Sequence, residues 1–156
     1  MVYAVLKVLH VLSVVVWVGG MFFTLFFLRP AAALMELPER VRLMHEVLRK
    51  FFKAVLVLSL LALVSGVAMM LMARGASPLP GEPAPMPWSW SVMAAVGVVM
   101  VAIFGHIRFV LFRRLHEALA LQAWSTGGAA LASIRSWVRA NLALGLAVII
   151  LVVGAG

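Results

Sequence analysis

Long apolar segments alternate with shorter polar stretches along this chain. The apolar segments run from about residue 3 to 28, 51 to 73, 88 to 112 and 137 to 153. A hydrocarbon core of about 30 Å is crossed by about 20 residues of α-helix, so each segment is long enough to span a membrane. The pattern predicts an all-α fold, an integral membrane four-helix bundle that forms a single transmembrane domain over residues 1–156.

The connection between the first two spans has the features of a helix. Pro38 and Glu39 are typical of a first helical turn, and Glu46 with Lys50 has the spacing of an i,i+4 ion pair. We therefore expect an interfacial helix over about 38–50 that runs into the second span.

The other two connections differ from this one. Five prolines between residues 75 and 87 exclude a helix and predict an extended outer loop. Residues 113–136 have a helical pattern at both ends, and we expect an interruption at 125–128, where Ser, Thr and two Gly follow one another.

Composition supports the membrane class and limits the chemistry. The chain is 65% hydrophobic and 12% charged, with a mean hydropathy of +1.15, which a soluble domain could not cover with polar surface. It has no cysteine, so disulfides, thiolate metal sites and cysteine nucleophiles are excluded. Soft-metal chemistry must then use the four histidines and ten methionines.

The positive charges predict an orientation and a partner. A net charge of +8 beside hydrophobic spans indicates contact with anionic lipid headgroups at the cytoplasmic face, and no nucleic acid. Loops one and three hold most of the basic residues, so we expect both to be cytoplasmic and both termini to lie on the non-cytoplasmic side. The first span is too long in its apolar core for a signal peptide, and we expect a retained helix.

His10 is the most informative residue of the first span. At 100° per residue, a polar stripe shares one helical sector: Lys7, His10, Ser13, Trp17, Met21 and Thr24. Polar side chains in a membrane seek partners, so this stripe should face other helices. His106 lies late in the third span, roughly 15–20 Å deeper along the membrane normal at 1.5 Å per residue. The two histidines should not share one metal or haem.

Methionines lie at the expected depth of His10. Met69 and Met70 close the second span near the outer side, and Met93 opens the third span there. An imidazole with thioethers is a ligand set that Cu(I) prefers, and it also suits haem iron as a His/Met axial pair. Packing by methionine as apolar filler explains the same residues.

The inner side offers a second group of candidates. His106 lies within a span and is a candidate cofactor ligand, and Arg108 could pair with a haem propionate. His45 and His116 lie in basic flanking regions, and we expect solvated interfacial residues there. We find no phosphate-binding glycine loop, HExxH motif or paired intramembrane carboxylates, which makes hydrolytic chemistry improbable.

Three stretches resemble the copper resistance protein D (CopD) family of bacterial membrane proteins. They are Leu9-His10 followed by Trp17-Val18-Gly19-Gly20, then RKFFKAVLVLSLLALVSGVAM from Arg49 to Met69, and IRSWVRANLALGLAV from Ile134 to Val148. The resemblance implies a bacterial inner membrane protein that handles copper by binding, uptake or resistance, with His10 as the ligand candidate.

A more distant similarity is to the HemJ-type, haem-associated membrane proteins. Lys7-x-x-His10, Trp17 and the Gly20-x-Phe22 step agree with that pattern, whereas the Tyr-Leu-Pro-Arg expected after Phe22 is replaced by Phe23-Thr24-Leu25-Phe26. This resemblance implies haem b, with His10 and His106 as ligand candidates.

Three hypotheses follow. The first is Cu(I) binding through His10 and the outer-side methionines Met69, Met70 or Met93. The second is a haem b redox protein that passes electrons to quinone or a membrane partner, the one case in which the chain would be an enzyme. The third is a cofactor-free subunit or assembly factor. A lone four-span chain has little room for a transport pathway, which favours a homodimer or a membrane protein partner.

Overall fold

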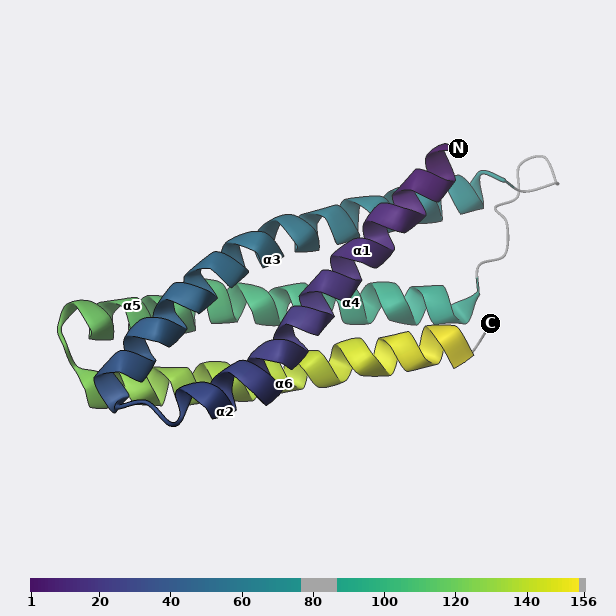
Figure 1. The fold of residues 1–156 in the computed structure, drawn as a ribbon. Helices are drawn as coiled ribbons and strands as arrows, with labels where there is room; N and C mark the ends of the chain where they lie inside the picture. Colours follow the sequence, from purple (N-terminus) through teal and green to yellow (C-terminus); the bar gives the residue numbers. More distant parts are fainter. Residues whose placement is uncertain (77–86, 155–156) are drawn as a thin grey trace.

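Four long helical rods make up the computed structural model, which describes residues 1–76 and 87–154 (Figure 1). The first rod contains α1 (Val2–Phe23), the π-helical turn η1 (Thr24–Leu28) and α2 (Arg29–Ala32). The second is α3 (Leu37–Arg74). The third contains α4 (Trp88–His106), the π-helical turn η2 (Ile107–Leu111) and α5 (Phe112–Ala120), and the fourth is α6 (Trp124–Gly154).

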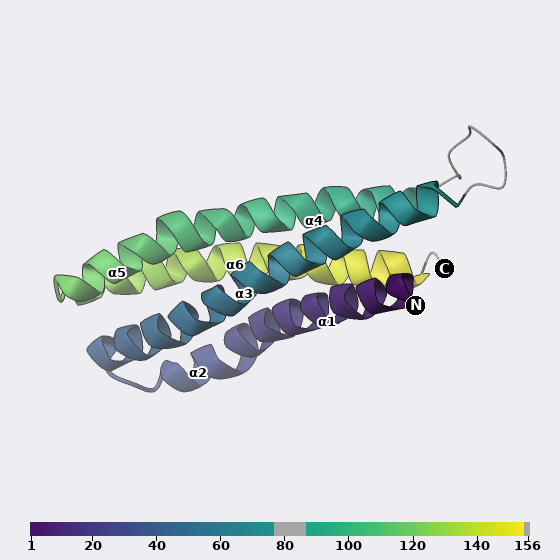
Figure 2. The ribbon, with the colours of Figure 1, turned by 90° about the horizontal axis from the view of Figure 1, so that it is seen from above.

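The rods confirm the predicted all-α membrane bundle. Each is long and apolar enough to cross a membrane, so the chain is a multi-pass membrane protein. α1 packs mainly against α3, while α4 and α5 pack mainly against α6 (Figures 1 and 2). The proline-rich outer loop predicted over 75–87 lies mostly outside the described residues. The membrane side on which the termini lie stays a prediction.

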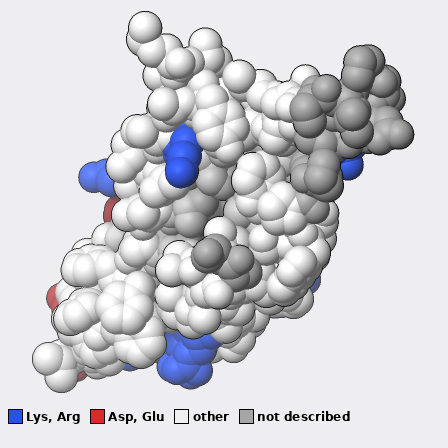
Figure 3. Space-filling model, turned by 90° about the vertical axis from the view of Figure 1, so that its right-hand side faces the viewer, with Lys and Arg blue, Asp and Glu red and all other residues white. Residues whose placement is uncertain are grey.

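The two ends of the bundle differ in charge. Both chain termini lie at one end, together with the facing ends of α3 and α4, and we call this the terminal end (Figure 1). Seen directly, the terminal end is mostly uncharged, with few basic side chains in view (Figure 3). The opposite end, here the arginine end, is formed by α2, α5, the start of α3 and the first half of α6, and its basic residues include Arg29, Arg40, Arg42, Arg113, Arg114, Arg135 and Arg139.

The tightest packing lies toward the arginine end. The core members from α3 come from its first half, and those from α6 come from residues 131–142. Val41, Val55 and Leu115 have no exposed surface at all. The rings of Phe104 and Phe112 meet Phe52 edge-on, with centroids 5.9 and 5.4 Å away. The arginine half of the bundle therefore fixes the relative position of the four rods.

The start of α3 follows the sequence prediction in part. Pro38 lies in the first helical turn with Glu39, as predicted. Glu46, however, pairs with Arg49 at 2.8 Å and not with Lys50. The i,i+3 arginine offers two donors to one carboxylate oxygen, which a lysine cannot do.

The predicted break at 125–128 is wrong, because the helix interruption lies at residues 121–123. α5 ends at Ala120, and Gln122 takes a left-handed conformation with φ of 52°. The Ala123 N–H then donates to the Ala118 carbonyl at 2.9 Å, which closes the end of α5. The glycines at 127 and 128 belong to α6, where a Cβ on Gly127 would lie 3.0 Å from Val41. Glycine here permits close helix packing rather than a turn.

Two adjacent glycines in α1 give a prediction with a built-in control. A Cβ on Gly20 would lie 2.3 Å from the Phe51 ring of α3, whereas a Cβ on Gly19 would meet nothing within 4 Å. Gly19→Ala should be neutral or stabilising because alanine favours the helix. Gly20→Ala should be less stable than Gly19→Ala by about 1–2 kcal/mol, since the Phe51 ring must move.

Detergent unfolding of the two variants, followed by circular dichroism, measures this difference. Equal stability of Gly19→Ala and Gly20→Ala would show that α1 and α3 do not approach as closely as the structure has them.

Candidate functional site

A cavity of about 370 Å³ lies among α1, α3, α4 and α6, between the tight core and the terminal end. Its lining is almost entirely apolar. The residues with candidate chemistry among those lining it are His10, Trp17, Met70, Met93 and Met100. The cavity therefore brings together one imidazole and three thioethers from three different helices.

The His10 imidazole is held in one tautomer by α3. Its Nδ1 lies 2.9 Å from the carbonyl oxygen of Ala62. A carbonyl oxygen only accepts hydrogen bonds, so Nδ1 must carry the proton and donate it. Ser65 Oγ lies 3.3 Å from the same nitrogen, and the Ser65 hydroxyl itself bonds to the Leu61 carbonyl. The other ring nitrogen, Nε2, therefore keeps a free lone pair.

Such an arrangement is typical of a histidine that binds a metal. A ligating imidazole usually donates its second N–H to a carbonyl or carboxylate, which fixes the ring and raises its basicity. The half-buried His10 in α1 already has this support from the backbone of α3.

Two glycines make room for potential ligand side chains. A Cβ on Gly66 would lie 3.2 Å from His10 Cε1, and a Cβ on Gly145 would lie 3.1 Å from Met100 Cε. Both distances are shorter than ordinary van der Waals contact. The absence of a side chain at Gly66 and Gly145 therefore lets His10 and Met100 approach α3 and α6 closely.

The polar stripe of α1 faces the other helices over most of its length. Ser13, Trp17, Met21 and Thr24 are buried and His10 is half-buried, whereas Lys7 is exposed. The Trp17 ring packs edge-on against Phe104, with centroids 6.1 Å apart. Trp17 thus closes the cavity on the side of the tight core.

The predicted methionines separate into two groups. Met70 and Met93 line the cavity with His10, but Met69 is buried and is not among the lining residues. Met100, which we did not predict, is buried and lines the cavity. Met93 and Met100 are seven residues apart, about two helical turns, so they share one face of α4. This spacing could have identified Met100 from the sequence.

His106 and Arg108 lie elsewhere. His106 is exposed at the end of α4, where its ring lies 5.0 Å from that of Trp137, and it does not line the His10 cavity. The Arg108 guanidinium lies 5.3 Å from the Phe112 ring and 5.7 Å from the Phe109 ring. Cation–π contacts of this kind account for the position of the Arg108 guanidinium, with no need for a haem propionate.

His45 is not the solvated residue we expected. Its side chain is buried, with an exposed fraction of 4%, and its ring stacks on Phe112 at a centroid distance of 5.1 Å. His45 Nε2 lies 3.1 Å from Nδ1 of the exposed His116, so one nitrogen donates to the other. Glu46 Oε1 lies 3.4 Å from His45 Nδ1, near enough for an ion pair but outside hydrogen-bond geometry. The His45–His116 pair ties α3 to α5.

The nature of the donors limits which metals could bind. Within residues 1–76 and 87–154, no group of three or more His, Asp or Glu side chains lies close enough to hold a metal ion. A site for a hard, oxygen-preferring cation is therefore not formed by the described side chains. The donors that do gather are soft, namely the His10 imidazole and the thioethers of the cavity.

Comparison with known proteins places the chain in a family. A family model described as copper resistance protein D matches residues 45–155. This region contains α4, α5, α6 and most of α3, whereas α1 with His10 lies before it. Neither the curated proteins nor the solved structures give a match. Because the match covers more than two thirds of the 156 residues, the chain belongs to the copper resistance protein D family.

Proposed function

We propose that this membrane protein handles copper by binding Cu(I) as cargo in the cavity beside His10. The observation that carries this proposal is the His10 hydrogen bond to the Ala62 carbonyl, which leaves Nε2 free in a cavity shared with three methionines. Family membership supports copper as the metal. Imidazole and thioether donors suit Cu(I), while an apolar lining disfavours strongly hydrated divalent cations.

The ligand set in this proposal is His10, Met70, Met93 and Met100. It differs from the sequence expectation by gaining Met100 and losing Met69, which is not among the residues that line the cavity. The side chains come from α1, α3 and α4, so the site exists only when these helices are packed together. The cavity shares no lining residue with the arginine end, so it is separate from the arginines there, whose charge would repel a cation.

We also propose an orientation in the bacterial inner membrane. The arginine end should face the cytoplasm by the positive-inside rule, which puts the terminal end and the copper cavity near the opposite surface. Copper arriving from outside the cell would then meet the cavity first. A reporter active only outside the cytoplasm, fused after residue 156, should be active.

Replacing the cavity methionines by leucine tests the ligand set, because leucine has a similar volume but no sulfur. We expect each of Met70→Leu, Met93→Leu and Met100→Leu to weaken Cu(I) binding roughly tenfold, and the triple variant to bind no stoichiometric copper. Met69→Leu is the matched control and should bind as the wild type does. Competition with a chromogenic Cu(I) chelator measures the affinities on purified protein.

The same preparations distinguish copper from haem. The copper proposal predicts a colourless wild-type protein without a Soret band. A Soret band that His10→Ala abolishes would support haem b and overturn the copper proposal. Equal, substoichiometric copper in the wild type and the triple methionine variant would overturn it as well.

A further inference from the structure

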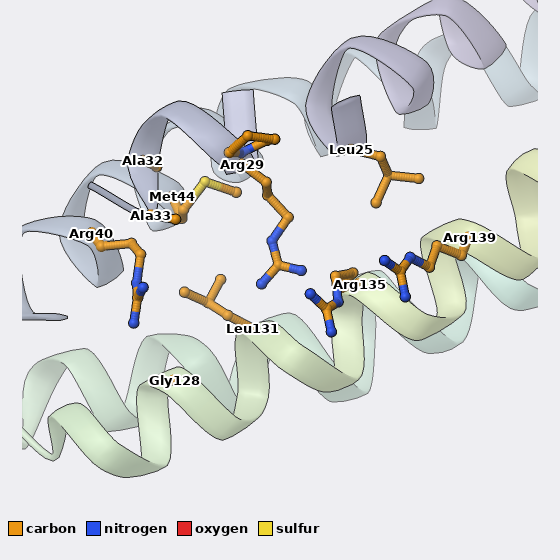
Figure 4. Close-up of a pocket in the computed structure, with 11 residues that line it drawn as sticks. Leu25, Arg29, Ala32, Ala33, Arg40, Met44, Gly128, Leu131, Arg135 and Arg139 are labelled. Atoms are coloured by element: carbon orange, nitrogen blue, oxygen red, sulfur yellow. The ribbon is translucent and has the colours of Figure 1, made fainter. Parts of the chain in front are cut away.

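A second cavity lies at the arginine end and is lined by arginines. It has a volume of about 330 Å³ and is bounded by the end of the first rod, the start of α3 and the first half of α6. Four of the lining residues are basic: Arg29, Arg40, Arg135 and Arg139. In Figure 4 the guanidinium groups of Arg29 and Arg135 extend toward each other, Arg139 lies beside them, and Arg40 stands beyond Leu131.

No carboxylate among residues 1–76 and 87–154 forms an ion pair with these arginines. None of the residues that line the cavity is acidic, and the ion pairs found in the described chain involve other basic residues. Arg29 is half-buried, and the charges of Arg135, Arg139 and Arg40 act on it. Like charges brought together in a partly dry space repel one another unless an anion joins them.

One of the arginines that line this cavity also has a buried nitrogen without a partner in the described part of the chain. Arg29 Nη1 is fully buried and has no hydrogen-bond partner among residues 1–76 and 87–154. A buried N–H group of a charged side chain is costly to leave unpaired. The guanidinium fork matches the oxygens of phosphate, to which it can donate two parallel hydrogen bonds.

Local helix geometry aims Arg29 at this cavity. The π-helical turn η1 ends immediately before Arg29, and Thr24 Oγ1 donates to the Gly20 carbonyl at 2.7 Å at its start. A π-helical turn inserts an extra residue and so rotates the helix that follows by about 100°. Arg135 and Arg139 are four residues apart on α6 and therefore share one face.

The geometry points to a binding site for a phosphate group, held by Arg29 and Arg135 with Arg139 beside them. A volume of about 330 Å³ admits a polyatomic anion, since one water molecule takes only about 30 Å³. Apolar side chains, among them Leu25, Met44 and Leu131, line the rest of the cavity. A mixture of arginines and apolar groups near a helix end suits the phosphate of an anionic phospholipid headgroup.

Thermal unfolding tests this site, because an anion that binds only the folded protein raises the midpoint temperature. Wild type, Arg29→Gln, Arg135→Gln and Arg114→Gln are compared in neutral detergent alone, with phosphatidylglycerol, and with inorganic phosphate. Arg114→Gln is the matched control, since Arg114 is exposed at the same end and does not line the cavity, and the substitution removes the same positive charge.

We expect phosphatidylglycerol to raise the midpoint of the wild type and of Arg114→Gln by about 3 °C or more. Arg29→Gln and Arg135→Gln should lose most of this gain, corresponding to at least about tenfold weaker binding. In neutral detergent alone, the same two variants should match or exceed the wild type, because one repelling charge is gone. Without the anion, Arg29→Gln and Arg135→Gln should therefore have midpoints equal to or above that of the wild type. With phosphatidylglycerol, their midpoints should fall below it.

The outcomes separate the sources of the phosphate. A gain from inorganic phosphate alone, lost in Arg29→Gln and Arg135→Gln, would support the site and identify a free anion as its ligand. Equal responses to phosphatidylglycerol in all four proteins would overturn the proposal, because the lipid would then act through general charge. If Arg29→Gln does not fold, Arg135→Gln and Arg139→Gln decide between these results. Copper binding should be unchanged in every variant.

Discussion

Replacing Phe52 by alanine should lower the free energy of unfolding by about 2–4 kcal/mol. The Phe52 side chain has an exposed fraction of 2%, and its ring packs edge-on against Phe104 of α4 and Phe112 of α5. It therefore joins the second rod to the third at the tightest part of the core. Alanine leaves a cavity that these rings cannot close without moving two helices.

The expected loss is smaller than the roughly 3–5 kcal/mol that the same substitution costs in a soluble protein, for a physical reason. An unfolded membrane helix stays in lipid or detergent, so the removed ring does not forfeit transfer from water. What is lost is packing and the two ring contacts, each worth about 0.5–1.5 kcal/mol beyond burial.

A lipid-facing phenylalanine gives the matched control for Phe52→Ala. Phe26 has an exposed fraction of 59% and touches only Phe22 among the aromatic rings of the described chain. Phe26→Ala should change the free energy of unfolding by less than about 1 kcal/mol. Reversible unfolding by a denaturing detergent, followed by circular dichroism, measures both variants. Equal losses would mean that the core does not centre on Phe52.

The spans were predictable because a membrane imposes one strong rule. A helix must present about 20 apolar residues to lipid, and this signal needs no knowledge of tertiary contacts. Helix ends outside the apolar runs carry a weaker signal. The break after α5 depends on the left-handed Gln122, a residue type with no strong preference for that conformation, so the sequence pointed to the glycines instead.

Helix phase limited what could be predicted of the copper cavity. Depth alone groups His10 with Met69 and Met70, since adjacent residues have nearly the same depth. Met69 and Met70 differ by about 100° of rotation around the helix axis, and only the packing of α3 on α1 decides that Met70 lines the cavity. Met100 lies deeper than the outer third of its span, so depth alone does not group it with His10.

The arginine cavity was beyond sequence analysis for a different reason. Its members come from three separate stretches of the chain, and each arginine is explained singly by the positive-inside rule. The π-helical turn that directs Arg29 inward is not visible in a hydrophobic pattern that assumes 3.6 residues per turn. Only the folded chain shows that these charges share one space.

His10→Ala should lower Cu(I) affinity by at least about a hundredfold, which is more than the 10–100-fold typical of losing a group that only orients a ligand. His10 is the one imidazole among the residues that line the cavity, and three thioethers alone bind Cu(I) less strongly than the same set with imidazole. His106→Ala is the matched control, because His106 is exposed and packs on Trp137 outside the cavity. Its affinity should equal that of the wild type.

The position of the His10 ring can be tested without removing it. Gly66→Ala places a methyl group 3.2 Å from His10 Cε1, so the ring must move by a few tenths of an ångström, which perturbs its hydrogen bond to the Ala62 carbonyl. We expect Gly66→Ala to weaken Cu(I) binding roughly tenfold while the helical circular dichroism spectrum stays that of the wild type. Chelator competition on both variants measures the two effects. If His10→Ala keeps the wild-type affinity, copper is bound elsewhere. If Gly66→Ala keeps the wild-type affinity while His10→Ala loses it, the His10 ring binds copper without needing its hydrogen bond to the Ala62 carbonyl.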